Sequence, residues 1–159
     1  MTRLPKARAC GNCTCCCTRL AVDEIGKPAK HRCEHLREGG CRVYAVRPGS
    51  CAEYRCLWLT GSAALPLAAH RPDRLGLMFD QAAEPHVALR LTQAAGDRWL
   101  IARELWPGAA GVGEAARVLE SLATQGLILM DFWDGRPTGN LRGPRDLVRR
   151  AQAAAGESV

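Results

Sequence analysis

The chain has 159 residues, of which 47% are hydrophobic and 24% are charged, and this composition is typical of a globular protein rather than a disordered, collagenous or membrane protein. Its 22 basic and 16 acidic residues give a formal net charge of +6, but the basic residues are scattered and form no tract of five or more, which argues against nucleic-acid binding. Nine cysteines all lie between Cys10 and Cys56, so a thiol-rich segment precedes a cysteine-free one.

The expected cellular compartment follows from the N-terminal residues, the apolar segments and the cysteines. Residues 1–8 are basic but precede no apolar run, and no segment approaches the roughly 18 apolar residues of a membrane span. We therefore expect no secretory signal, no membrane association and a cytoplasmic location. In a reducing cytoplasm, dense cysteines indicate metal ligands or redox groups rather than disulfides, and their odd number agrees with this.

The first cysteines follow the pattern C-x2-C-x2-C-C, formed by Cys10, Cys13, Cys16 and Cys17, with Cys15 as an additional thiol. A C-x2-C gap suits a tight turn that points two thiolates at one metal. Three cysteines at successive two-residue gaps are also typical of the bacterial ferredoxin sequence, which holds an iron–sulfur cluster. In extended backbone the adjacent Cys16 and Cys17 would point to opposite faces, so they could serve two centres, or one of them could be a packing residue.

Further thiols follow at wider spacing, with glycine or proline near several of them, and these residues permit the sharp backbone paths that converging ligands need. Without Cys15 there are eight thiols, enough for two four-thiolate sites or for one site and a reserve. The predicted ligands are Cys10, Cys13, Cys16, Cys17, Cys33, Cys41, Cys51 and Cys56. Cys15 is expected to be a spare thiol, and His35 is expected to support a ligand by a hydrogen bond or to be spare.

The identity of the metal stays open between iron–sulfur and zinc, because soft thiolates stabilise both. Zinc sites usually pair one C-x2-C with a second, whereas the later cysteines here are separated by 7, 9 and 4 residues. The triple spacing of the first cysteines favours a 4Fe–4S cluster, with Zn²⁺ as the alternative.

The cysteine-free segment begins after a predicted seam at residues 60–62. We expect a cysteine-rich region at 1–60 and a support region at 61–159, which together form one compact domain. Short strands are predicted at 75–80 and 87–92, joined as a hairpin. Residues 97–106 fit a helix or a strand, and Pro107-Gly108 ends either one.

The remaining segment predicts two helices and one strand. Apolar residues recur at helical spacing over 113–125, and Gly126 follows as a stop. An apolar run at 127–133 predicts a buried strand, and a last helix is expected over 144–155 with proline in its first turn. The predicted fold is therefore α+β: an irregular, metal-binding cysteine-rich part packed on a small support of about three strands and two helices.

The cysteine order resembles the CxxCxxCC family of zinc- or iron-chelating proteins. The resemblance rests on the eight patterned cysteines, with Arg47-Pro48 between them, and it covers at least residues 10–60 and more loosely the chain to about residue 135. It implies metal chelation but no agreed reaction. Cys15 departs from the family pattern.

Three functions are compatible with this sequence. The predicted one is a metal- or cluster-binding protein with a redox, delivery or sensing role. The alternatives are a zinc-stabilised interaction module for a protein or nucleic-acid partner and a small metalloenzyme. The sequence contains no phosphate-binding glycine loop, no G-x-S-x-G and no H-E-x-x-H, so it identifies neither a catalytic residue nor a small-molecule substrate.

Overall fold

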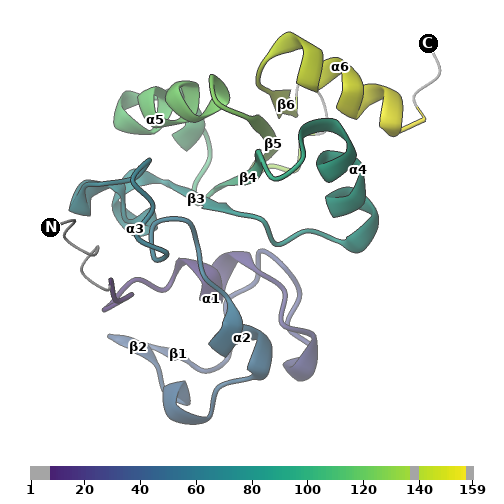
Figure 1. Cartoon of the computed structure of the whole chain (residues 1–159). Helices are drawn as coiled ribbons and strands as arrows, with labels where there is room; N and C mark the ends of the chain where they lie inside the picture. Colours follow the sequence, from purple (N-terminus) through teal and green to yellow (C-terminus); the bar gives the residue numbers. More distant parts are fainter. Residues whose placement is uncertain (1–7, 137–139, 157–159) are drawn as a thin grey trace, which may run out of the picture.

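A four-stranded sheet organises the C-terminal part of the protein (Figure 1). The computed structural model describes residues 8–136 and 140–156, so the N-terminal residues used to exclude a secretory signal lie largely outside it. The strands, in spatial order, are β3 (Leu77–Asp80), β4 (Trp99–Glu104), β5 (Leu127–Asp131) and β6 (Leu141–Arg142). The β4–β5 pair is parallel and the two outer pairs are antiparallel.

Helices cover both faces of this sheet. Successive residues of a strand point to opposite faces, and Ile101 and Ala102 of β4 accordingly belong to two different apolar clusters. On one face lies α5 (Gly113–Ala123); on the other, α4 (Pro85–Ala95) and α6 (Arg145–Ala154) pack against each other (Figure 1). None of the helices in the described ranges is long and apolar enough to cross a membrane.

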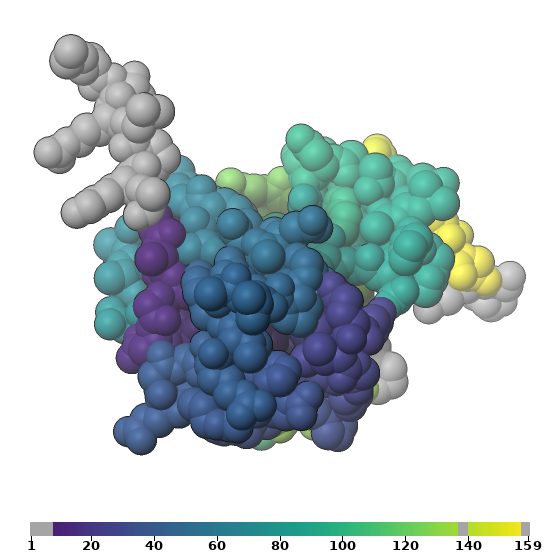
Figure 2. Space-filling model, turned by 90° about the horizontal axis from the view of Figure 1, so that it is seen from below, coloured from purple at the N-terminus to yellow at the C-terminus, as the bar shows by residue number. Residues whose placement is uncertain are grey.

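Residues 8–60, here called the cysteine block, contain only short elements. These are α1 (Cys15–Arg19), the 3₁₀ turns η1 (Asp23–Ile25) and η2 (Tyr44–Val46), the strands β1 (Leu36–Arg37) and β2 (Gly40–Cys41), and α2 (Gly49–Glu53). The turn η3 (Ala68–His70) and α3 (Pro72–Leu75) then lead into β3, and η4 (Ala109–Gly111) precedes α5. Much of the face seen in Figure 2 is formed by the purple-to-blue residues of the cysteine block.

The mixed α+β class is confirmed, as are several predicted elements. The strands at 75–80 and 127–133 are present as β3 and β5, each shorter than predicted. The helices at 113–125 and 144–155 are present as α5 and α6 within two residues of their predicted bounds.

The predicted strand at 87–92, and with it the hairpin, is wrong. These residues belong to α4, which begins with Pro85 and buries Leu91, Ala94 and Ala95 on one face, while Leu89 is exposed. The partner of β3 is instead β4, so the ambiguous segment 97–106 is a strand. Among the described residues, the sheet thus has four strands rather than three, and three long helices rather than two accompany it.

The cysteine block is joined to the sheet by backbone and side-chain contacts. The Leu57 amide donates to the carbonyl of Phe79 in β3 at 2.7 Å, which extends the sheet edge by one bond. The Tyr54 hydroxyl donates to Asp80 Oδ2 at 2.7 Å, and Leu57 packs against the apolar cluster beneath α5. These contacts fix the end of the cysteine block relative to β3.

Candidate metal centre

The first cysteines lie in a turn that leads into a short helix. The Cys13 amide donates to the Cys10 carbonyl at 2.9 Å, and Gly11 between them takes a positive φ of 56°. Cys16 and Cys17 follow in α1, so their side chains diverge by about 100° rather than pointing to opposite faces of extended backbone. The extended geometry expected for this pair is therefore wrong, although two differently directed thiols remain.

The later cysteines lie in separate segments, and one of these segments is bonded to α1. The Cys33 amide donates to the Cys17 carbonyl at 3.0 Å, which places Cys33 directly beside α1. Cys41 lies in β2 opposite Leu36, and Cys51 lies in α2. Cys56 precedes the residue that bonds to β3, so the sheet edge fixes its position.

One set of neighbouring thiols consists of Cys10, Cys13, Cys16 and Cys56. Burial raises the pKa of Cys56, and the thiols of Cys10 and Cys13 lie near enough to add to this rise. A hydrogen bond with Cys17 and burial raise the pKa of Cys16, and the same two thiols add to that rise. We call these four residues the first thiol group. This group combines the C-x2-C-x2-C turn with Cys56, which lies far along the chain and is not part of the local motif.

A second set consists of Cys17, Cys33 and Cys51, which we call the second thiol group. Burial raises the pKa of Cys51, and the Cys17 thiol, the Glu24 carboxylate and the Cys33 thiol add to this rise, so these groups lie within electrostatic range of Cys51. Cys41 follows Cys33 through the β1–β2 hairpin, which brings its backbone close to this group without fixing its thiol there. The thiols of Cys16 and Cys17 are hydrogen-bonded to each other and both lie near Cys13, so the two thiol groups adjoin.

The thiols are gathered but do not yet form a closed coordination sphere. Within residues 8–136 and 140–156, no three Cys, His, Asp or Glu side chains are arranged so that they could hold a metal ion. All nine cysteines are free, with Cys33 and Cys56 buried and the other seven half-buried. For His35, the described residues provide no hydrogen bond to a cysteine; its Nε2 lies 3.7 Å from Glu34 Oε1.

Hydrogen bonds between neighbouring thiols divide them into acidic and weakly acidic members. A hydrogen bond from Cys15 lowers the pKa of Cys13 to about 6, and a bond from Cys16 lowers the pKa of Cys17 to about 7. The pKa values of Cys15 and Cys16 are raised in return. One thiolate in each group is thereby favoured near neutral pH, and thiolate is the form that binds a metal.

Cationic side chains surround both groups. Arg47 and Arg55 lie near enough to the Cys10 thiol to oppose the rise in its pKa that burial causes, and Arg71 is close to Cys13 and Cys15. Lys27 lies among the thiols of the second group. Because a metal held by four thiolates carries net negative charge, these cations suit such a centre. The soft donor set and its cationic surroundings together fit zinc or an iron–sulfur cluster.

Arg71 also positions the first thiol group through hydrogen bonds. Its Nη2 donates to Asn12 Oδ1 at 2.8 Å and its Nη1 to the Cys10 carbonyl at 3.4 Å. Asp73 holds the guanidinium in turn, at 2.6 and 2.7 Å. Cysteine spacing gives no indication of this support, because Arg71 lies beyond the cysteine block.

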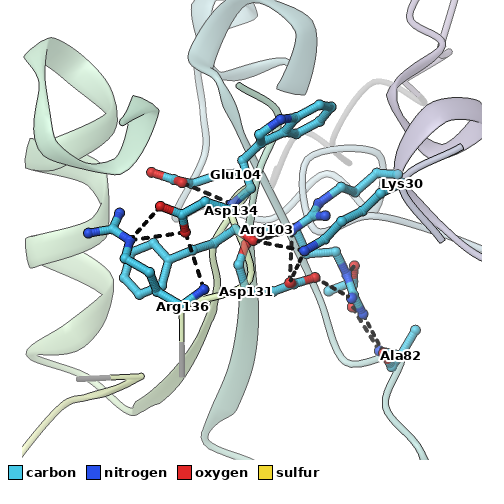
Figure 3. Close-up of polar contacts among 11 residues, drawn as sticks. Lys30, Ala82, Arg103, Glu104, Asp131, Asp134 and Arg136 are labelled. Carbon is cyan, nitrogen blue, oxygen red and sulfur yellow. Dashed lines mark hydrogen bonds and ion pairs between the residues drawn. The ribbon is translucent and has the colours of Figure 1, made fainter. Parts of the chain in front are cut away.

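A set of ion pairs centred on Asp131, here called the ionic seam, joins α1 to the sheet. Arg19, the last residue of α1, is 1% exposed, and its Nη2 lies 2.8 Å from Asp131 Oδ1 at the end of β5. Arg103 and Lys30 also extend toward Asp131, at 3.1 and 4.0 Å (Figure 3). Arg103 in turn binds Asp80, the acceptor of Tyr54. The helix that carries three cysteines is thus anchored by charge to β5.

Compared with protein-family models, with curated proteins and with solved structures, the chain matches none of them. The resemblance to the CxxCxxCC family therefore rests on the residues quoted for it.

Proposed function

We propose that this protein binds a metal through thiolates of its cysteine block, an irregular part carried on the α+β support, as the resemblance to the CxxCxxCC family implies. The observation that carries the proposal is that Cys33 is bonded to the helix of the first cysteines, its amide donating to the Cys17 carbonyl at 3.0 Å, while Cys51 and Cys56 lie within electrostatic range of cysteines from that turn and helix. Thiols from distant segments have no reason to converge among cations if they are only small apolar side chains. A shared metal provides that reason.

The form of centre that the sequence favours is a 4Fe–4S cluster, held by the first thiol group. This group contains the three cysteines at two-residue gaps and has Cys56 as a fourth neighbour. When bound, such a cluster supplies one-electron redox chemistry, which suits a redox, delivery or sensing role. The chain's own residues would hold it, and Arg47, Arg55 and Arg71 would offset its negative charge.

Purification with and without oxygen tests the proposal. Protein isolated anaerobically should contain stoichiometric iron and acid-labile sulfide and should absorb in the visible range, and exposure to air should reduce all three. Cys13→Ser should abolish iron binding by the first group. Cys15→Ser is the matched control, because it removes a thiol from the same turn that is expected to be spare, and it should retain the wild-type content.

Three results would contradict parts of this proposal. Protein that contains neither iron nor zinc under either condition would refute metal binding altogether. Colourless protein with stoichiometric zinc and no sulfide would refute the cluster and leave zinc. Loss of metal from Cys15→Ser but not from Cys13→Ser would refute the assignment of ligands.

A second candidate is a zinc-stabilised interaction module for a protein partner. It is favoured by the turn between Cys41 and Cys51, where Tyr44 is 59% and Val46 is 80% exposed. Arg47 stacks over the Tyr44 ring, with its guanidinium carbon 3.9 Å from the ring centroid. Zinc without sulfide, together with folding of the cysteine block only when zinc is present, would select this candidate over the redox role.

A further inference from the structure

An apolar cavity lies between α3 and the start of α5. It has a volume of about 370 Å³, and its apolar lining includes Leu75 at the end of α3, Trp106, Ala109, and Val112 and Ala115 at the start of α5. We call it the Trp106 cavity. None of its lining residues belongs to the cysteine block. Its volume is within the range of binding sites in proteins and is enough to receive a large side chain.

The Trp106 side chain is fixed in place and yet partly exposed. Gly76, which ends α3, has a positive φ of 84°, and a Cβ at this position would lie 2.5 Å from Cζ2 of the indole. The Leu105 amide donates to the Gly76 carbonyl at 3.0 Å, which holds the chain beside Trp106. The indole therefore packs against the Gly76 backbone, but 43% of Trp106 remains exposed. A fixed and partly exposed tryptophan is typical of the residues that dominate binding in protein interfaces.

A second exposed apolar side chain, that of Val112, lies at the same cavity. Val112 is 65% exposed and is the N-cap residue of α5, where its side chain makes no capping hydrogen bond. Serine, threonine, aspartate and asparagine are preferred at this position because they bond the free amides of the first turn. Valine thus exposes apolar surface where a polar residue would stabilise the helix. Single exposed apolar residues are common, but two at one cavity form a patch of the kind that binds a partner.

The cavity also has one unbalanced charge, that of Arg74. Two charged side chains complete its lining, Arg74 and Glu114, and the Glu114 carboxylate lies 2.6 Å from Arg117. Asp73, the neighbour of Arg74, lies 2.6 Å from Arg71. In the part of the chain that the structure describes, no carboxylate oxygen lies within 4.0 Å of the exposed Arg74. An occupant that carries a carboxylate would therefore be complementary to the cavity in both charge and polarity.

We propose that the Trp106 cavity docks an acidic segment of a partner protein, which inserts a large apolar side chain beside Trp106 and places a carboxylate on Arg74. Burial of apolar surface supplies the affinity, and Arg74 selects acidic segments over basic ones. The inference does not depend on metal binding. The cavity nevertheless adjoins the first cysteines through α3, because Arg71 at the start of this helix donates to the Cys10 carbonyl and Leu75 at its end lines the cavity.

Titration of the full-length, isotopically labelled protein with defined peptides tests this inference. The probe is Ac-SDLLDS-NH2, which has carboxylates on both sides of two leucines, so that either chain direction can place one on Arg74. Ac-SNLLNS-NH2 lacks the charge, Ac-SDSSDS-NH2 lacks the apolar side chains, and Ac-SKLLKS-NH2 reverses the charge. Nuclear magnetic resonance follows the backbone amides and the indole N–H of Trp106, and the shifts give both the binding site and the affinity.

We expect the acidic peptide to shift the Trp106 indole and the amides around the cavity, and to bind about threefold more tightly than the neutral peptide. The peptide without leucines should cause no shift. Arg74→Glu should reverse the preference, so that the basic peptide binds it better than the acidic one. Val112→Asp should weaken binding of the acidic peptide about tenfold while α5, with a better N-cap, stays folded. Leu89→Asp and Arg98→Glu make the same changes at exposed positions outside the cavity and should bind like the wild type.

Other results overturn the inference. Absence of shifts around Trp106 with the acidic peptide would show that the cavity does not bind such a segment. Equal affinities for the acidic, neutral and basic peptides would show that Arg74 does not select, and so would an Arg74→Glu variant with unchanged preference. Shifts confined to Tyr44 and Val46 would assign docking to that turn instead. Shifts around Trp106 that depend on protein concentration alone would assign the cavity to a second copy of this chain.

Discussion

The cysteine block and the sheet region are stabilised in different ways. In the sheet region, two apolar clusters bury large side chains such as Phe79, Leu119 and Leu147 on the two faces of the strands. Among the described residues of the cysteine block, the buried hydrophobic residues are Val22, Leu36 and the two cysteines Cys33 and Cys56, and none belongs to either cluster. A region of this size with so little apolar burial needs another source of stability.

The cysteine block has two such sources, the ionic seam and the thiols. Arg19 and Tyr54 tie it to β5 and β3, whereas on the proposed function a metal held by the thiols would connect its own segments to one another. The sheet region is therefore predicted to keep its fold without a bound metal, whereas on the proposed function the internal order of the cysteine block should depend on what the thiols bind. The following predictions test this difference.

The largest effect is expected from removal of metal. Because the free energy of metal binding is also folding free energy for a block without an apolar core, chelation should abolish the protection of amides in the cysteine block. The amides of β4, β5 and α5 should stay protected. Hydrogen exchange with and without chelator measures both. Equal protection of the cysteine block in metal-free protein would contradict the comparison.

A substitution in the apolar core should destabilise the sheet region and leave metal binding by the cysteine block unchanged. Leu119 is fully buried in α5, so Leu119→Ala should lower the free energy of unfolding of the sheet region by about 3 kcal/mol. Denaturant unfolding measures this, and metal content under native conditions should not change. Leu89→Ala, at an exposed position of α4, is the control and should change stability by less than about 0.5 kcal/mol. Loss of metal from Leu119→Ala would show that the two regions are not separately stabilised.

Breaking the ionic seam should lower the free energy of unfolding by a smaller amount, because the seam joins the two regions. Asp131→Asn leaves the buried Arg19 guanidinium without its carboxylate, and we expect a loss of about 2 kcal/mol in the free energy of unfolding, less than for a fully buried pair because Asp131 is 31% exposed. Arg19→Met in the same background should then cost less than it does alone. A double-mutant cycle on metal-loaded protein measures this coupling. Additive effects would mean that the pair does not join the regions.

The smallest effect concerns pH in the sheet region. Glu114 accepts hydrogen bonds from Arg117 and His70, which hold its pKa below the ordinary value of 4.5. The contribution of this carboxylate is therefore present above pH 4.5 and is lost as the pH falls through the lowered pKa. In metal-free protein, Glu114→Gln should flatten the dependence of stability on pH between 5 and about 3. An unchanged slope in denaturation curves would argue against this contact.

Sequence patterns predicted the helices and strands of the sheet region correctly where the pattern of apolar residues extends over many positions. The apolar spacing of α5 and the run of β5 each continue over enough residues to define one period. The segment 87–92 was misread because Val87, Leu89 and Leu91 alternate like a strand, whereas the positions buried further on, Ala94 and Ala95, follow the helical period from Leu91. Strand β6 has two residues, too few to show any period.

The sequence predicted the cysteines of the candidate site but not the basic residues that surround them. Spacing in the sequence indicates the cysteines because turns that hold metals need short gaps. Lys27, Arg19 and Arg71 have no such spacing, and their burial or contacts depend on segments that meet only in the folded chain. For the same reason, the hydrogen bond between the Cys16 and Cys17 thiols becomes visible only in the structure.

X-ray absorption spectroscopy of the anaerobically purified protein tests the central claim most directly, because it measures the atoms bound to the metal. We predict a first shell of sulfur only, at about 2.3 Å if the metal is zinc, and iron neighbours at longer distance if it is a 4Fe–4S cluster. A first shell dominated by oxygen or nitrogen, or a protein with no metal to measure, would contradict a thiolate centre in the cysteine block.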